Sequence, residues 1–165
     1  MSIKLAKARL KKAITIGESR FQQVNRERLI MIAKMFTVGP MWTNCYLVGC
    51  EEKKEAVVID PGFDGVREAE KIMKAVEKEK LHVKYIVNTH GHSDHISGNG
   101  ILKEMTGASI LIHEYDAAML TSSERNFSYM YGEKVASPPA DKLLREGDII
   151  SAVSYTHLTL PTKRI

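Results

Sequence analysis

The sequence predicts an α/β fold in which short strands alternate with helices. Two observations predict it: short apolar runs bounded by Gly, Pro, Asn or Asp recur along the chain, and apolar residues at helical spacing lie between them. This alternation is typical of layered α/β domains. The chain has 165 residues, of which 44% are apolar, and that is enough to bury the core of one domain.

The first expected elements are three strands. A strand pattern begins at Met31 and continues to residue 38, and a second apolar run covers residues 45–48. A charged connector then leads to a third apolar run over residues 56–59, which ends at an Asp-Pro-Gly turn. We therefore expect a hairpin followed by a sharp stop.

A helix is expected over residues 65–80. Asp64 stands just before it and can cap its first turn. Lysines and an arginine occupy the opposite face, as in an amphipathic surface helix. The apolar residues at helical spacing are Val66, Ala69, Ile72, Met73 and Val76.

The rest of the chain continues the alternation and then contains a long loop over residues 122–140. A structureless stretch of that length is more often a functional lid or rim than filler. The loop contains three aromatic residues, Phe127, Tyr129 and Tyr131. They could line the mouth of a substrate pocket or pack the loop against the domain, and both interpretations stay open. The other expected elements are a strand over 83–88, a helix over 96–105, a strand over 109–112, a short helix over 116–120 and a strand that begins at Asp148.

The net charge of +4 does not point to nucleic acid. Residues 1–30 hold eight Lys and Arg against two Glu, so the other 135 residues carry 16 basic and 18 acidic side chains. A protein that binds a polyanion needs a basic surface on its folded domain, and the folded domain is slightly acidic here. We expect no nucleic-acid partner.

Residues 1–30 form a basic leader. A transit peptide, a basic surface helix and translated sequence upstream of the true start compete as explanations, and the last is favoured because Met31 opens the strand pattern. The longest uncharged stretch, 35–50, is interrupted by Gly and Pro and is too short to span a bilayer, so no membrane partner is expected. Cys45 and Cys50 lack C-x-x-C spacing, and two free thiols suit a cytoplasmic location.

The strongest chemical signal follows the strand at 83–88. Four potential metal ligands occur within six residues: His90, His92, Asp94 and His95. In an extended segment residues two apart project to the same side, so His90 and His92 can converge on one cation. Gly91 between them removes the side chain that would crowd them. Asp94 and His95, displaced by the turn into the next helix, would face a neighbouring position.

These residue types suit a hydrolytic metal centre. Neutral imidazole binds zinc, iron or manganese, and a carboxylate adds the charge that a second nearby divalent ion needs. Two ions a few ångströms apart can hold a shared water whose pKa falls far enough to supply hydroxide near neutral pH. The motif therefore predicts a metal-dependent hydrolase.

The chain resembles the metallo-β-lactamase fold superfamily over residues 31 to 152. Its H-x-H-x-D-H motif is the one just described, and the segments 38–48, 57–62 and 89–95 are similar to those of glyoxalase II-like hydrolases. The resemblance implies an αββα sandwich with a metal site at one edge of its two sheets. It also implies a small-molecule thioester substrate, such as a glutathione conjugate.

The resemblance further implies residue roles. His90 and His92 would bind the first metal ion, and Asp94 and His95 the second, with zinc expected and iron or manganese possible as alternatives. Asp94 would also be able to accept a proton, which makes it the candidate catalytic residue. Asp60 would be the buried aspartate that supports the ligand loop from behind the metal ligands.

The sequence also departs from the family pattern. The third histidine of the first metal, the bridging aspartate and the last histidine are not found, so we expect residues 31–152 to be the first half of the sandwich. Residues 153–165 resemble translated adapter sequence and are expected to be a non-native tail, in which His157 lacks the usual glycine turn. His113, at the end of an apolar run, is expected to be a strand-end residue rather than a ligand.

The expected function is that of a glyoxalase II-like thioester hydrolase that uses a metal-bound hydroxide. A mononuclear iron persulfide dioxygenase shares much of the motif and is the enzymatic alternative. A phosphodiesterase or nuclease is disfavoured by the acidic domain. A truncated fragment without catalytic activity is the alternative from a different class.

Overall fold

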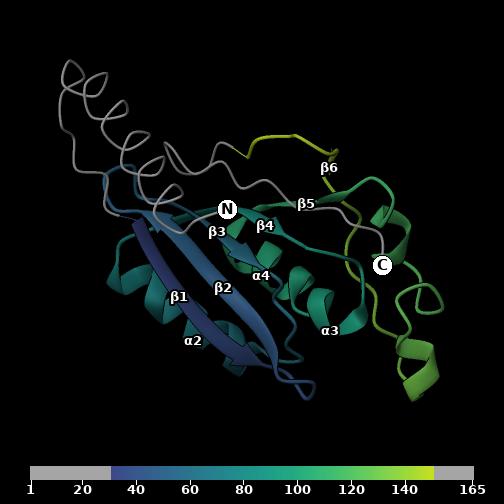
Figure 1. Ribbon diagram of the computed structural model, residues 1–165. Coiled ribbons are helices and arrows are strands. Elements are labelled where there is room, and N and C mark those ends of the chain that lie inside the picture. Colours follow the sequence, from purple (N-terminus) through teal and green to yellow (C-terminus); the bar gives the residue numbers. More distant parts are fainter. Residues whose placement is uncertain (1–30, 151–165) are drawn as a thin grey trace, which may run out of the picture.

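The structure is a computed structural model that describes residues 31–150 (Figure 1). The expected basic leader, the non-native tail and His157 lie outside the described residues. Within residues 31–150, no helix is both long enough and apolar enough to cross a membrane.

The described residues form a six-stranded mixed sheet in which the strands follow one another in chain order. The first three strands pair antiparallel, and the pairs from the third strand to the sixth are parallel. The strands are β1 (Met31–Val38), β2 (Thr43–Cys50), β3 (Glu55–Ile59), β4 (His82–Val87), β5 (Ser109–His113) and β6 (Lys142–Leu144).

Helices connect the parallel strands. β3 is joined to β4 by α2 (Val66–Lys78), and β4 to β5 by α3 (Ser93–Ile96) and α4 (Asn99–Thr106). Between β5 and β6 the chain makes two 3₁₀ turns, η1 (Ala117–Met119) and η2 (Ser128–Tyr131). The predicted α/β fold is thus confirmed, with one β layer and one α layer of the expected αββα sandwich.

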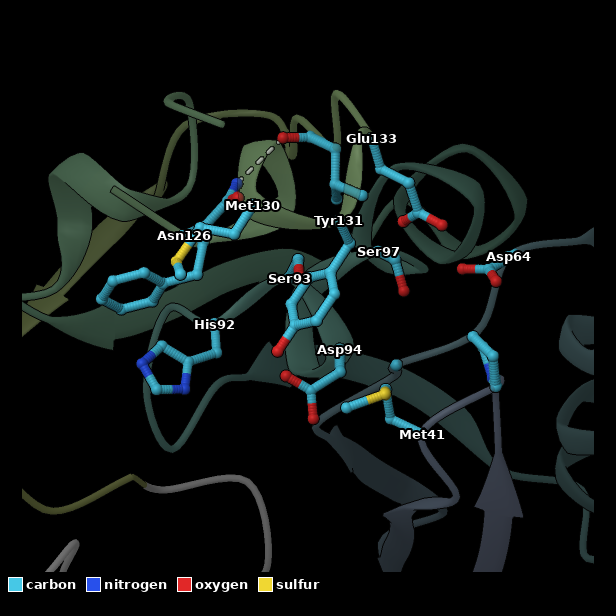
Figure 2. Close-up of a pocket in the computed structure, with 14 residues that line it drawn as sticks. Met41, Asp64, His92, Ser93, Asp94, Ser97, Asn126, Met130, Tyr131 and Glu133 are labelled. Carbon is cyan, nitrogen blue, oxygen red and sulfur yellow. Dashed lines mark hydrogen bonds between the residues drawn. The ribbon is translucent and has the colours of Figure 1, made fainter. Parts of the chain in front are cut away.

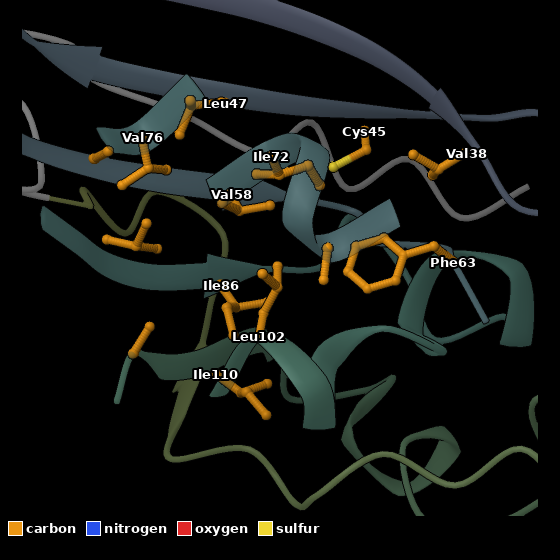
Figure 3. Packing of buried hydrophobic residues seen from close by; sticks show 14 of the residues in the cluster. Val38, Cys45, Leu47, Val58, Phe63, Ile72, Val76, Ile86, Leu102 and Ile110 are labelled. Atoms are coloured by element: carbon orange, nitrogen blue, oxygen red, sulfur yellow. The ribbon is translucent and has the colours of Figure 1, made fainter. Parts of the chain in front are cut away.

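The two faces of the sheet differ in what covers them. On one face, alternate strand residues such as Leu47, Val58 and Ile86 pack against Ile72 of α2 and Leu102 of α4 (Figure 3). These side chains are fully buried and form the main core. The opposite face carries a smaller cluster, which among the described residues contains strand residues and Ile150 but no helix residue: Cys50, Val57, Val87, Leu111, Leu144 and Ile150.

The expected helix over 65–80 is confirmed as α2, but its expected cap is wrong. Gly65 occupies the N-cap position, and no side chain makes a capping hydrogen bond there. Asp64 is exposed and lines a pocket instead.

The helix expected over 96–105 is two helices. Gly98 separates them because it packs against the turn after β3: a Cβ there would lie 2.5 Å from the ring of Phe63 and from the Pro61 carbonyl oxygen. The Gly98 N–H donates to that same carbonyl at 2.7 Å. The packing fixes the end of α3, and with it the predicted ligand motif, against the β3–α2 turn.

The prediction of a strand that begins at Asp148 is wrong within the described residues. Residues 145–148 make a turn, in which the Arg145 N–H donates to Asp148 Oδ2 at 2.9 Å and Gly147 has a φ of +86°. The sixth strand is Lys142–Leu144, which pairs parallel with β5. The short helix expected over 116–120 is the 3₁₀ turn η1.

Candidate functional site

The predicted ligands lie at the carboxyl end of two neighbouring parallel strands. Ile59 and Val87, the last residues of β3 and β4, are paired in the sheet. The Asp60 N–H then donates to the Val87 carbonyl at 3.0 Å, which continues the pairing one residue further. Asp60 and the motif that follows Val87 are therefore side by side, at the sheet edge where ligand sites of α/β folds are usually found.

Asp60 holds the start of the motif. Its Oδ1 accepts the Thr89 N–H at 2.8 Å, and its Oδ2 accepts the Thr89 hydroxyl at 2.7 Å. The same Oδ2 lies 3.2 Å from His95 Nδ1. Asp60 is buried and has a φ of +51°, in the left-handed region. One carboxylate thus connects both ends of the segment from Thr89 to His95.

The three imidazoles gather around His90. Its ring centroid lies 4.5 Å from that of His92 and 4.1 Å from that of His95. Asp94 joins them through Oδ2, which lies 3.3 Å from His95 Nε2. The structure therefore brings together all four residues of the motif.

Burial and charge shift the pKa of two of these histidines in opposite directions. Burial, followed by the neighbouring His95 and His92, lowers the pKa of His90. Burial also lowers the pKa of His95, but the Asp60 and Asp94 carboxylates outweigh it, and the pKa of His95 is raised overall. The lowered pKa favours the neutral His90 ring, which is the form that binds a metal ion.

The donor set fits a metal centre in its chemistry, because imidazole and carboxylate groups are ligands of zinc and iron. His95 Nδ1 is buried and, despite its closeness to Asp60, makes no aligned hydrogen bond. Among residues 31–150, no three His, Cys, Asp or Glu side chains are grouped so that they could hold one ion. The grouping of His90 with His92 and of Asp94 with His95 on two separate ions stays a prediction, because the His90 ring lies closer to that of His95 than to that of His92.

A pocket of about 410 Å³ opens beside this cluster (Figure 2). His92 and Asp94 lie on one side of it, Asp64 and Glu133 on the other, and the Tyr131 hydroxyl points toward Asp94. Apolar side chains from two loops complete its wall: Pro40, Met41, Phe127, Met130, Tyr131 and Val135.

The loop over residues 122–140 forms one wall of the pocket, as a rim would. The Phe127 ring meets the His92 ring edge to face, with centroids 5.1 Å apart. The Ser93 N–H donates to the Asn126 carbonyl at 3.0 Å, which ties the loop to the motif. Of the three aromatic residues left open by the sequence, Phe127 and Tyr131 line the pocket, whereas Tyr129 is exposed and is not among its lining residues.

Sequence reasoning missed Thr43, whose hydroxyl donates to Asp94 Oδ2 at 3.0 Å, and the lining residues Met41 and Glu133. A lone Thr at the start of a strand carries no signal of this contact, because its partner is 51 residues away. His113 lies at the end of β5, as expected, where its Nδ1 accepts the Tyr115 N–H at 3.3 Å. Cys45 and Cys50 are both free and buried.

Known proteins share this sequence pattern over part of their length. An uncharacterized protein of Aquifex aeolicus is 38% identical over 120 residues, which are 73% of this chain and 54% of that protein. A hydroxyacylglutathione hydrolase of Pelagibacter ubique is 44% identical over 71 residues, 43% of this chain and 28% of the relative. A mitochondrial persulfide dioxygenase of Bos taurus is 41% identical over 63 residues, 38% of this chain and 24% of the relative. The matches thus span about half or less of these relatives.

Solved structures share the fold. The BLEG-1 B3 metallo-beta-lactamase superposes with a TM-score of 0.64 at 28% identity, covering 73% of this chain and 56% of that one. The di-iron-bound form of TTHA1623 gives a TM-score of 0.57 at 28% identity, over 71% of this chain and 56% of that one.

The family model of the metallo-beta-lactamase superfamily matches residues 38–163, which is most of the chain and includes the whole ligand motif. The resemblance seen in the sequence is thereby confirmed. Members of this family are metallo-hydrolases that typically bind zinc or iron. The chain belongs to the metallo-beta-lactamase superfamily.

Proposed function

We propose that the chain carries the metal-binding motif of a thioester hydrolase similar to glyoxalase II. The observation that carries the proposal is the convergence of His90, His92, Asp94 and His95 at the edge of a pocket. The similarity to a hydroxyacylglutathione hydrolase supports the substrate class, a glutathione thioester of a hydroxy acid.

In this proposal His90 and His92 hold one metal ion, and Asp94 and His95 hold a second. Divalent ions bound there would supply Lewis acidity, which lowers the pKa of water and polarises a carbonyl. Asp94 lies where it can also accept a proton from an attacking water molecule, because its carboxylate faces the pocket (Figure 2). Asp60 keeps the ligand segment in place through Thr89.

The pocket would bind the organic part of the substrate. Met41, Phe127 and Met130 offer apolar surface for an acyl or thiol chain, and Phe127 also packs against His92. A thioester would bind between this wall and the ligand cluster. Exclusion of water by the apolar wall would strengthen the electrostatic interactions at that point.

The test measures thiol release from a hydroxyacyl-glutathione thioester by the unmutated protein loaded with metal. The same assay then compares two variants, His92→Ala and His82→Ala. His82 is exposed on β4 and serves as a matched control. We expect His92→Ala to lose turnover by at least about a hundredfold and to lower the metal content, since an imidazole ligand is gone. Normal turnover with full metal content in His92→Ala would contradict the proposal.

A persulfide dioxygenase is the second candidate, and the similarity to the Bos taurus protein favours it. The two candidates differ in metal content and in reaction. Two ions per chain with thiol release support the hydrolase. One iron per chain, with oxygen consumed in the presence of a glutathione persulfide, supports the dioxygenase.

A further inference from the structure

Thr43 is the first residue of β2 and lies against the ligand motif from a distant part of the chain. Its exposed fraction is 7%, and its hydroxyl donates to Asp94 Oδ2 at 3.0 Å. The direction of the bond is certain, because an ionised carboxylate can only accept. A buried hydroxyl that donates to a charged group makes one of the stronger hydrogen bonds in proteins.

We propose that Thr43 is a positioning residue, which orients the Asp94 carboxylate for metal binding. The inference rests on the proposed role of Asp94 as a metal ligand. Thr43 lies outside the H-x-H-x-D-H motif and would act through Asp94.

The geometry explains how a single hydroxyl can do this. The carboxyl torsion of an aspartate is broad, so an unrestrained carboxylate samples many orientations. Both contacts described above for the Asp94 carboxylate, with Thr43 Oγ1 and with His95 Nε2, are made by Oδ2. Fixing one oxygen sets the plane of the group and leaves Oδ1 as the oxygen that can turn to a metal ion.

The backbone of Asp94 is fixed by packing at the same point. A Cβ on Gly62 would lie 1.6 Å from the Asp94 carbonyl oxygen and 3.3 Å from Thr43 Cβ. Only glycine therefore permits the turn after β3 to approach both residues. Gly62 sets the position of the Asp94 main chain, and Thr43 sets the orientation of its side chain.

The hydroxyl of Thr43, rather than its size, is the property that should matter. Valine has nearly the shape of threonine but cannot donate, whereas serine keeps the hydroxyl and lacks the methyl group. Loss of a group that orients a metal ligand typically lowers metal affinity by about 10- to 100-fold. We expect Thr43→Val to lose affinity in that range and Thr43→Ser to stay within about threefold of the parent.

The experiment titrates the 165-residue chain with Zn²⁺ in competition with a chromophoric chelator, and with Co²⁺ while its visible absorption is recorded. Thr37→Val, an exposed position in β1, is the matched control and should leave both readouts unchanged. The Co²⁺ spectrum of Thr43→Val should shift, because the orientation of a carboxylate ligand changes. Parent-like affinity and spectrum in Thr43→Val would overturn the proposal, as would a loss in Thr43→Ser as large as that in Thr43→Val.

Two further variants separate this inference from folding and from the proposed function. Thr43→Ala removes the hydroxyl without placing an apolar group against the carboxylate, so it tests the same bond if Thr43→Val does not fold. Asp94→Asn tests the ligand assignment itself. Weakened metal binding in Asp94→Asn together with parent-like binding in both Thr43→Ala and Thr43→Val would overturn only the role of Thr43. Parent-like binding in Asp94→Asn would overturn the ligand assignment, and with it this inference.

Discussion

At the scale of the residue, Asp60 has the largest structural task in the site. Its two oxygens accept from the Thr89 N–H and hydroxyl, and one of them faces His95. Its backbone is in the left-handed region, which aspartate tolerates better than most residues. Position, charge and backbone conformation therefore all suit aspartate here.

Asp60→Asn should lower the stability of the metal-free chain by about 1–3 kcal/mol. The amide keeps the size and the backbone conformation but has one acceptor oxygen, so one of the two Thr89 donors is left without its partner. Urea denaturation measures the loss. Asp64→Asn, the same change at an exposed position four residues later, should cost less than about 0.5 kcal/mol. Equal stability of both variants would contradict this account.

Cys45 gives a prediction of pH dependence. The thiol has no exposed surface, and burial, followed by the charge of Asp60, raises its pKa from 9.0 to about 12. The unfolded chain releases this proton above pH 9, whereas the folded chain keeps it until about pH 12. The contribution of the buried thiol to stability is therefore complete below pH 9 and is lost as the pH rises through that interval.

Comparison with Cys45→Ala isolates this effect, because the variant has no thiol to ionise at this position. The stability advantage of the parent over the variant should shrink by about 1.4 kcal/mol per pH unit above pH 9. Urea denaturation between pH 8 and pH 11 measures it. A constant difference across that range would show that the Cys45 pKa is not raised.

At the scale of the element, three buried polar side chains join the ligand motif, α4 and the long loop. Asn88 Nδ2 donates to the His95 carbonyl at 3.0 Å. Asn99, at the start of α4, donates to Asn88 Oδ1 and to Ser137 Oγ, both at 2.9 Å. The loop over residues 122–140 is therefore fixed to the site by side chains as well as by the Ser93–Asn126 backbone bond.

Asn99→Ala should lower the stability by about 2–4 kcal/mol, because it leaves Asn88 and Ser137 buried with lost partners. Amide hydrogen exchange should also speed up in the loop over residues 122–140. The matched control is Asn44→Ala at an exposed position of β2, which should change stability by less than about 0.5 kcal/mol. A loop that exchanges as slowly in Asn99→Ala as in the parent would contradict this role.

The elements also show where sequence reasoning succeeds. The amphipathic pattern of α2 and the apolar runs of β3, β4 and β5 predicted those elements. Burial of one face gives a helix a period of 3.6 residues, and burial of both faces gives a strand a continuous apolar run, so both signals are visible locally. β6 has three residues, too few for any period, and the break between α3 and α4 depends on the contact of Gly98 with Phe63. Both are decided by tertiary contacts.

The residues of the candidate site also fall into two groups, those that the local sequence predicts and those that only the fold brings in. The sequence predicted that His90 and His92 converge and that Asp94 and His95 face a neighbouring position. The structure brings all four residues together, with the His90 ring 4.5 Å from that of His92 and 4.1 Å from that of His95. Thr43 and Met41 reach the site only through the fold, so no local pattern marks them. The sequence left two roles open for Phe127, lining a substrate mouth or packing the loop down. Its contact with the His92 ring places it beside the candidate site, in the first of these roles.

At the scale of the whole molecule, the face of the sheet opposite the helices is apolar along a continuous row. The apolar row crosses β1 to β5 with one residue from each strand, and Lys142 of β6 ends it: Met35, Tyr46, Ile59, Val87 and Leu111. Val87 and Leu111 are buried, but Met35 is 59% exposed and Tyr46 is 38% exposed. The β1–β2 end of this face is thus an exposed apolar surface, and such surfaces favour association.

We therefore expect the 165-residue chain to self-associate in a concentration-dependent way through the β1–β2 end of this face. Met35→Lys combined with Tyr46→Glu should reduce the association, and because the two positions face each other in the sheet, the opposite charges keep the strand pair compatible. Sedimentation velocity across a range of concentrations measures the effect. Val66→Lys, an exposed apolar position at the start of α2, is the control and should leave the association unchanged. The expectation is contradicted if the unmutated chain stays monomeric at every concentration. It is also contradicted if Val66→Lys abolishes the association as fully as the Met35→Lys and Tyr46→Glu double variant does.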